Sequence, residues 1–193
     1  QIENKLKERW NYPRMSTPFH REKRYFFYKN SGLQNHSVLY YKDGLNGKEI
    51  MLLDPNILSE DGSLSVSMIS VSKNGKLLAY GVSKSGSDWD EYYVMNIDTG
   101  EKYKDHLKWI KFSKAQWLPD ASGFYYSRYP EPSIGNEYKN QNHFNKLYLH
   151  KIGTDQSEDI LIYEDLEHPD YGFYSWITDD EKYQILGIWS GAN

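Results

Sequence analysis

Four segments of the chain repeat one order: a polar turn, then an apolar or aromatic strand. Each turn contains Asp, Asn, Gly or Lys. The four segments, each a turn with its strand, are residues 21–28, 72–80, 119–127 and 178–186. The strands are expected to begin near Tyr25, Leu77, Phe124 and Tyr183, at spacings of 52, 47 and 59 residues. After each of the first three, two further strands joined by a tight turn are expected, at 37–53, 90–103 and 145–163. Self-similarity at a fixed period constrains a fold strongly, because each repeat must be one supersecondary unit.

A period of roughly 40–50 residues with about four strands is typical of a β-propeller blade. One blade cannot bury both of its faces, so blades stack on their neighbours. Asp43-Gly44 and Asp98-Thr99-Gly100 suit the tight turns, because Asp and Gly tolerate positive φ. The prediction is an all-β fold: three antiparallel four-stranded blades and the inner strands of a fourth, part of a larger ring. A four-bladed propeller or a twisted all-β sandwich is the competing interpretation.

The first residues differ from the repeats. Ile2, Leu6 and Trp10 have helical spacing, and Pro13 and Pro18 break any helix after them. We therefore expect a linker with a short helix at 1–18 and the propeller blades at 19–193.

Composition excludes several function classes. The net charge is −4 and the 23 basic residues are scattered, so a nucleic-acid partner is not expected. The sequence has no apolar run of about 18 residues, so no membrane-spanning helix is expected. There is no cysteine, which excludes disulfides, thiolate zinc ligands and thiol nucleophiles. The chain is predicted to be cytoplasmic, and a periplasmic location stays open.

No catalytic constellation is visible. The nucleophile motif G-x-S-x-G is absent, and its nearest match, Gly81-Val82-Ser83-Lys84-Ser85, has serine in place of the last glycine. None of the six histidines pairs with another at metal-ligand spacing, and no glycine-rich phosphate loop occurs. His150 is interpreted as a surface residue of a strand, and the acidic segment 164–170 as a solvated loop. The residues alone therefore predict no metal, no cofactor and no catalytic residue.

Four phrases are more specific than the blade pattern. They are Gly32-Leu33-Gln34-Asn35, Leu53-Asp54-Pro55-Asn56, Ser85-Gly86-Ser87-Asp88-Trp89 and 153–161, GTDQSEDIL. Their order and spacing resemble the propeller domain of the prolyl oligopeptidase (prolyl endopeptidase) family, from about Tyr12 to Asn193.

The resemblance implies a two-domain serine peptidase that cuts short proline-containing peptides after proline. In that family a seven-bladed propeller caps an α/β-hydrolase domain, which carries the catalytic triad and comes after the propeller in the chain. Residues 1–18 would lead from the catalytic domain, and 19–193 would be the first half of the propeller. This chain alone is then expected to be inactive. A stand-alone propeller that binds a protein or another ligand without catalysis is the alternative.

The resemblance also assigns roles to single residues. It implies that Asp88 contacts an arginine of the hydrolase domain, with Trp89 packed beside it; the alternative is a hairpin loop whose aspartate caps its own turn. It implies that Phe112 lines the substrate pocket; the alternative is a core strand aromatic. Two further substrate positions fall near Phe173 and at Ala192. Many relatives carry a larger apolar residue near Gly172, and some have cysteine in place of Ala192; these departures put the fine shape of that pocket in doubt.

Overall fold

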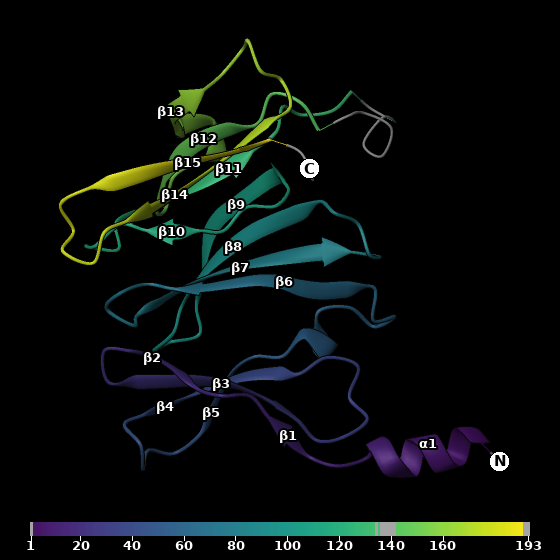
Figure 1. Cartoon of the computed structure of the whole chain (residues 1–193). Coiled ribbons are helices and arrows are strands. Elements are labelled where there is room, and N and C mark those ends of the chain that lie inside the picture. The colour runs from purple at the N-terminus through teal and green to yellow at the C-terminus, as the bar shows by residue number, and fades with distance from the viewer. Residues whose placement is uncertain (1, 134, 136–141, 191–193) are drawn as a thin grey trace. The chain divides into compact units, whose positions relative to one another are not determined.

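The computed structural model describes residues 2–133, 135 and 142–190. The chain divides into two compact units, one of residues 1–66 with 84–86 and the other of residues 67–83 with 87–193. Almost all regular structure is β-strand, as the turn-and-strand repeat predicts (Figure 1). The short helix α1 (Ile2–Trp10) coincides with the helical pattern read from the sequence.

The first sheet forms most of the first unit. It has the order β1-β3-β4-β5, and β2 also pairs with β3. Its strands are β1 (Arg14–Met15), β2 (Phe19–Arg21), β3 (Arg24–Asn30), β4 (Val38–Asp43) and β5 (Ile50–Leu53). A short 3-10 turn, η1 (Pro55–Ile57), comes after β5. The pair Arg14–Met15 belongs to this sheet although it lies within the range predicted as a linker, and the boundary at residue 18 stays a prediction.

Two four-stranded antiparallel sheets come next. The sheet β6-β7-β8-β9 consists of β6 (Leu64–Val71), β7 (Leu77–Lys84), β8 (Asp90–Asn96) and β9 (Lys102–Ile110). The sheet β10-β11-β12-β13 consists of β10 (Gln116–Trp117), β11 (Gly123–Arg128), β12 (Lys146–Lys151) and β13 (Ile160–Glu164). The 3-10 turn η2 (Gln156–Glu158) joins β12 to β13.

The last element is a two-stranded hairpin of β14 (Tyr171–Ile177) and β15 (Gln184–Ser190). Three sheets of at least four strands and then a hairpin confirm the prediction of about three and a half blades. The strands β3, β7, β11 and β15 begin within one residue of the predicted starts. Polar turns and alternating apolar residues are local signals, which is why this part of the fold can be read from the sequence.

The core of the second unit lies between the sheets β6–β9 and β10–β13. Side chains of both sheets contribute to one buried cluster, which includes Tyr92, Leu107, Trp117, Phe124 and Tyr126. Two neighbouring blades therefore bury their facing surfaces against each other, as the stacking argument requires.

His150 corrects one prediction. It lies in β12 with a side-chain exposure of 0%, so its interpretation as a surface residue is wrong. In a stack of blades, both faces of a strand are buried against neighbouring sheets. The residue pattern of a single strand does not show that a neighbouring sheet buries its second face.

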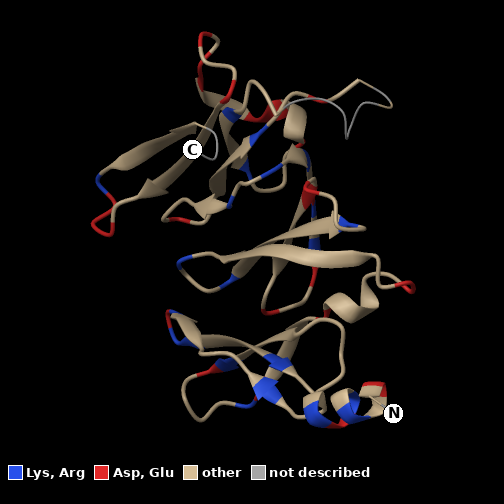
Figure 2. Cartoon of the chain, turned by 45° about the vertical axis from the view of Figure 1, so that its right-hand side comes forward, with Lys and Arg blue, Asp and Glu red and all other residues tan. Residues whose placement is uncertain are grey.

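Charged side chains lie in the helix, in strands and in turns. Figure 2 shows basic and acidic residues interspersed along both units of the chain. No helix among the described residues is long and apolar enough to cross a bilayer.

Candidate functional site

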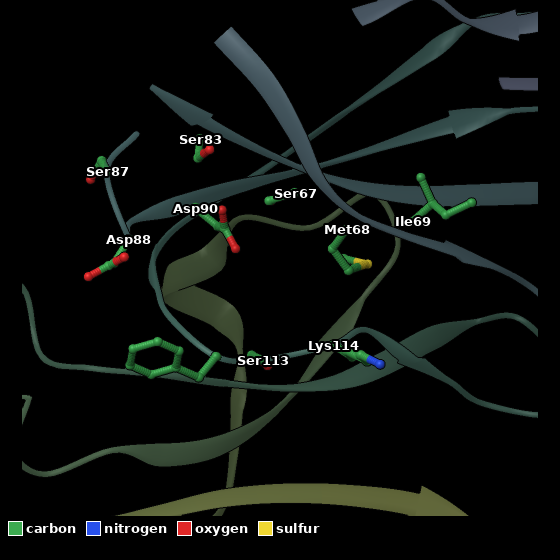
Figure 3. A pocket seen from close by; sticks show the side chains of 10 residues that line it. Ser67, Met68, Ile69, Ser83, Ser87, Asp88, Asp90, Ser113 and Lys114 are labelled. Carbon is green, nitrogen blue, oxygen red and sulfur yellow. The ribbon is translucent and has the colours of Figure 1, made fainter. Parts of the chain in front are cut away.

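A pocket of about 600 Å³ opens in the second unit. Four segments of the sequence form it: the middle of β6, the end of β7, the loop that leads into β8 with the first residue of β8, and the residues just after β9 (Figure 3). It brings together Asp88 and Phe112, which the sequence analysis singled out from two different motifs. The lining residues are Ser67, Met68, Ile69, Ser83, Ser87, Asp88, Asp90, Phe112, Ser113 and Lys114.

Two carboxylates line one side of the pocket. Figure 3 shows Asp88 and Asp90 on the side opposite Ser113 and Lys114. Asp88 is exposed, whereas Asp90 is half-buried at the start of β8. Burial raises the pKa of Asp90, a hydrogen bond with Ser67 opposes this, and the charge of Asp88 adds to the rise. The pocket therefore has an anionic side on which Asp88 is the accessible charge.

Trp89 anchors the loop that carries Asp88. Its ring meets Trp109 edge to face at 5.7 Å and Tyr129 at 6.2 Å. Its backbone N–H donates to Ser87 Oγ at 3.0 Å, and the loop turns at Ser85 and Gly86, which both have positive φ. Aromatic packing of this kind fixes a side chain by its large contact area. Asp88 and Trp89 are adjacent in the sequence but have different roles: the carboxylate of Asp88 is exposed to solvent, and the ring of Trp89 anchors the loop.

Lys111 packs against the face of the Trp89 ring. Its ammonium lies 4.0 Å from the centre of the Trp89 ring and donates to Asn142 Oδ1 at 2.9 Å. Burial lowers the pKa of Lys111, and the negative charge of Asp88 acts in the opposite direction. A cation over an indole face is stabilised by the ring quadrupole. The negative charge of Asp88 therefore already interacts with one cation of the same unit, the ammonium of Lys111.

Phe112 projects from a restrained backbone. It has φ +56° and an exposure of 60%, while its neighbours Lys111 and Ser113 are buried. The Tyr92 hydroxyl donates to the Ser113 carbonyl at 2.6 Å, and the Ser127 N–H donates to Ser113 Oγ at 2.8 Å. A bulky residue at positive φ is strained and persists only when its surroundings hold it. The structure therefore presents the Phe112 ring on the surface and does not use it as a core aromatic.

Trp189 in β15 is the aromatic partner of Phe112, and the sequence analysis missed it. The two rings meet edge to face at 6.1 Å. Trp189 is also paired with Gly172 across the hairpin, and its indole covers the space that a side chain at position 172 would occupy. The register of the hairpin, counted back from its turn, is the signal that could have revealed this pair.

The remaining predicted positions do not join Phe112. Phe173 has an exposure of 1%; it packs edge to face against Tyr163 at 5.0 Å, and its N–H donates to Asn145 Oδ1 at 3.0 Å. As a substrate contact it stays a prediction that its burial does not favour. Ala192 lies outside the described residues. No group of three or more His, Asp or Glu side chains able to hold a metal occurs within the described part of the chain.

Known proteins with similar sequences are prolyl peptidases. Over 193 residues the chain is 38% identical to a prolyl endopeptidase of Elizabethkingia miricola, covering 100% of this chain and 27% of that protein. It is 36% identical to prolyl oligopeptidase A of Amanita bisporigera over 217 aligned residues, covering 96% of this chain and 28% of the relative. The chain thus spans little more than a quarter of the length of these relatives.

Similar solved structures agree with this. Prolyl oligopeptidase B from Galerina marginata, bound to a 35mer hydrolysis and macrocyclization substrate, matches with a TM-score of 0.86 at 30% identity. The match covers 96% of this chain and 29% of that one. A family model described as the N-terminal β-propeller domain of prolyl oligopeptidase matches residues 1–193. The chain therefore belongs to the prolyl oligopeptidase family, in which it corresponds to the N-terminal β-propeller domain.

Proposed function

We propose that this chain is the substrate-gating propeller part of a prolyl-specific serine oligopeptidase, which hydrolyses short peptides after proline. The observation that carries the proposal is the common pocket of Asp88 and Phe112. Family membership and the names of the relatives support the reaction class. The cytoplasmic location remains a prediction from composition.

Asp88 is proposed to bind an arginine of the α/β-hydrolase domain of the same protein. Its carboxylate is exposed, and the anchored Trp89 limits the freedom of the loop that carries it. A guanidinium can donate two parallel hydrogen bonds to a carboxylate, so this contact would fix the orientation of the arginine. In this scheme Asp88 acts on the substrate only through that arginine.

Phe112 is proposed to contact the peptide residue two or three places before the scissile bond. Its exposed ring offers an apolar face, and Trp189 supports that ring from one side. Aromatic surfaces of this kind bind apolar side chains of a ligand.

The bond-breaking residues are expected in the hydrolase domain. A serine there would attack the prolyl carbonyl, a histidine would take its proton, and an oxyanion hole would stabilise the intermediate. The propeller would restrict access, so that short peptides enter and folded proteins do not. This chain contributes binding and access, and no residue of it is assigned to the chemical step.

The test uses the native protein in its full natural length. Its mass and its sequence beyond residue 193 should show more blades and then G-x-S-x-G, and it should cleave a short fluorogenic peptide after proline. Asp88→Asn should reduce kcat/KM by about tenfold or more, as expected when a charge-assisted contact is lost. Asp179→Asn, at an exposed aspartate outside the pocket, is the matched control and should leave kcat/KM unchanged. A protein without the motif and without proline-specific cleavage would contradict the proposal.

A further inference from the structure

The segment 153–159, GTDQSED, ties the third sheet to the second. The Gly153 N–H donates to Asp105 Oδ1 in β9 at 2.8 Å. The side-chain amide of Gln156 pairs with both backbone groups of Lys108 in β9: its nitrogen donates to the carbonyl at 3.0 Å, and its oxygen accepts from the N–H at 3.1 Å. The side-chain amide thus pairs with the backbone of β9 as a neighbouring strand would, although it belongs to a loop of the next sheet.

His150 lies at the centre of the same junction. Its Nε2 is 2.8 Å from Asp105 Oδ1, and its Nδ1 is 2.6 Å from Asp159 Oδ1. All three side chains have an exposure of 0%. An ionised carboxylate only accepts hydrogen bonds, so each ring nitrogen must carry a proton to bond its partner. The geometry therefore describes a buried imidazolium between two carboxylates.

The surroundings of the ring contain few other ionisable groups. Asp105 faces it from β9 and Asp159 from the end of η2, and the ring of Phe124 in β11 packs beside it at 5.4 Å. Tyr126, also in β11, donates its hydroxyl to Asp159 Oδ2 at 2.5 Å and accepts from the Gln156 amide at 3.0 Å. The doubly protonated ring is thus one buried cation between two carboxylates, and a neutral imidazole would lose its hydrogen bond to one of them.

The junction leads directly into the pocket segment. Lys108, which Gln156 clamps, precedes Trp109 with φ +63°, and Phe112 with φ +56° lies three residues beyond Trp109. Both conformations are unfavourable for aromatic residues and require external restraint. Asp105 and Lys108 supply fixed points on β9 just before these two residues.

We propose that His150, Asp105, Asp159 and Gln156 form a positioning network that holds Trp109–Phe112 in the pocket conformation, and that the network holds only while the imidazole carries both protons. The consequence for peptide binding rests on the proposed role of Phe112. The restraint of the segment itself does not depend on that role.

The proton balance agrees with this geometry. Burial by itself lowers the pKa of His150, but the hydrogen bonds and charges of Asp105 and Asp159 outweigh it and raise the pKa to about 9. Burial tends to raise the pKa of Asp105, whereas the hydrogen bonds from His150 and Gly153 prevail and lower it. The network is therefore intact at neutral pH and loses its central donor as the pH rises through about 9.

The first test uses NMR of the native full-length protein, with [15N]histidine and [15N]phenylalanine incorporated. At pH 7 both ring nitrogens of His150 should be protonated, and the ring should titrate near pH 9. The backbone amide of Phe112, identified with Phe112→Leu, should shift with the same midpoint. In His150→Gln that shift should disappear. A neutral His150 at pH 7, or a titration that leaves the Phe112 amide unmoved, would overturn the proposal.

The second test measures hydrolysis of a proline peptide by the same protein. KM should rise about tenfold above pH 9 in the wild type, with kcat changed less than about twofold, because only positioning is lost. Gln156→Ala should raise KM already at pH 7, and Ser157→Ala, at the exposed neighbour in η2, is the control. An unchanged KM in Gln156→Ala would contradict the effect on binding. If the protein does not cleave proline peptides at all, the proposed function fails, and the NMR result still decides the network.

Discussion

Trp189 lies directly across Gly172. The two residues are partners in the β14–β15 hairpin, and a Cβ at position 172 would fall 2.2 Å from an indole carbon. The Trp189 ring also meets Phe112 edge to face at 6.1 Å. The glycine therefore makes room for an aromatic that supports the pocket.

This contact predicts that Gly172→Ala destabilises the protein. The added methyl must displace the indole, and overpacking of this kind costs about 1–3 kcal/mol. Urea unfolding followed by far-UV circular dichroism measures the change. Trp189→Ala should also destabilise, but the double variant should be more stable than the sum of the two single effects predicts. Strict additivity would show that the two positions do not interact.

The backbone of Phe112 predicts that two truncations differ in stability. Phe112→Ala and Phe112→Gly both remove the exposed ring, but only glycine adopts φ +56° without strain. The glycine variant should therefore be more stable than the alanine variant by about 1 kcal/mol. Both should weaken peptide binding to the same extent if the ring is the contact. Equal unfolding free energies would argue against strain at this position.

Two histidines with carboxylate partners predict different mutational costs. His106 pairs with Glu91 at 2.5 Å on the surface, where the two side chains have exposures of 38% and 45%. His106→Ala should cost at most about 1 kcal/mol, because both partners keep their contact with water and Glu91 is not left buried. His150→Ala removes a wholly buried partner and should cost about 3–5 kcal/mol. Urea unfolding at pH 7 compares them, and similar costs would refute the buried network.

The pH dependence of stability has a definite sign. The folded-state pKa of His150 is about 9, above the ordinary value of 6.5, so its contribution is complete below pH 6.5 and is lost as the pH rises through about 9. A difference of this size corresponds to about 3 kcal/mol. The unfolding free energy should therefore fall between about pH 7 and 9.5, and this fall should be much smaller in His150→Gln.

At higher pH, buried tyrosines also change the unfolding free energy, which limits the pH range in which the effect of His150 can be read. Burial raises the pKa of Tyr92 and Tyr126 above the ordinary value of 10, so their ionisation in the unfolded chain adds a second loss of stability at higher pH. A fall that starts only above about pH 10 in the wild type would assign the effect to tyrosine and not to His150.

Part of the candidate site could be predicted from the sequence. The motif at 85–89 and the position of Phe112 identify two residues that share a pocket. The motif 153–159 is specific as a sequence, but its use as the tie between two sheets is not visible there. The family resemblance implies a substrate position near Gly172 and Phe173, whereas the alternation of side chains along β14 directs Phe173 into the core.

The sequence by itself determined the kind of structure that the chain forms: the short helix, the strands, their turns and the number of blades. These depend on signals within a few residues, namely turn chemistry and the alternation of apolar side chains. The tertiary structure alone decided that His150 is buried between two carboxylates, that Trp189 covers Gly172 and that Trp89 anchors the Asp88 loop. Each depends on which surface covers a strand or which residue stands opposite in register, and stacking and pairing between distant segments settle both.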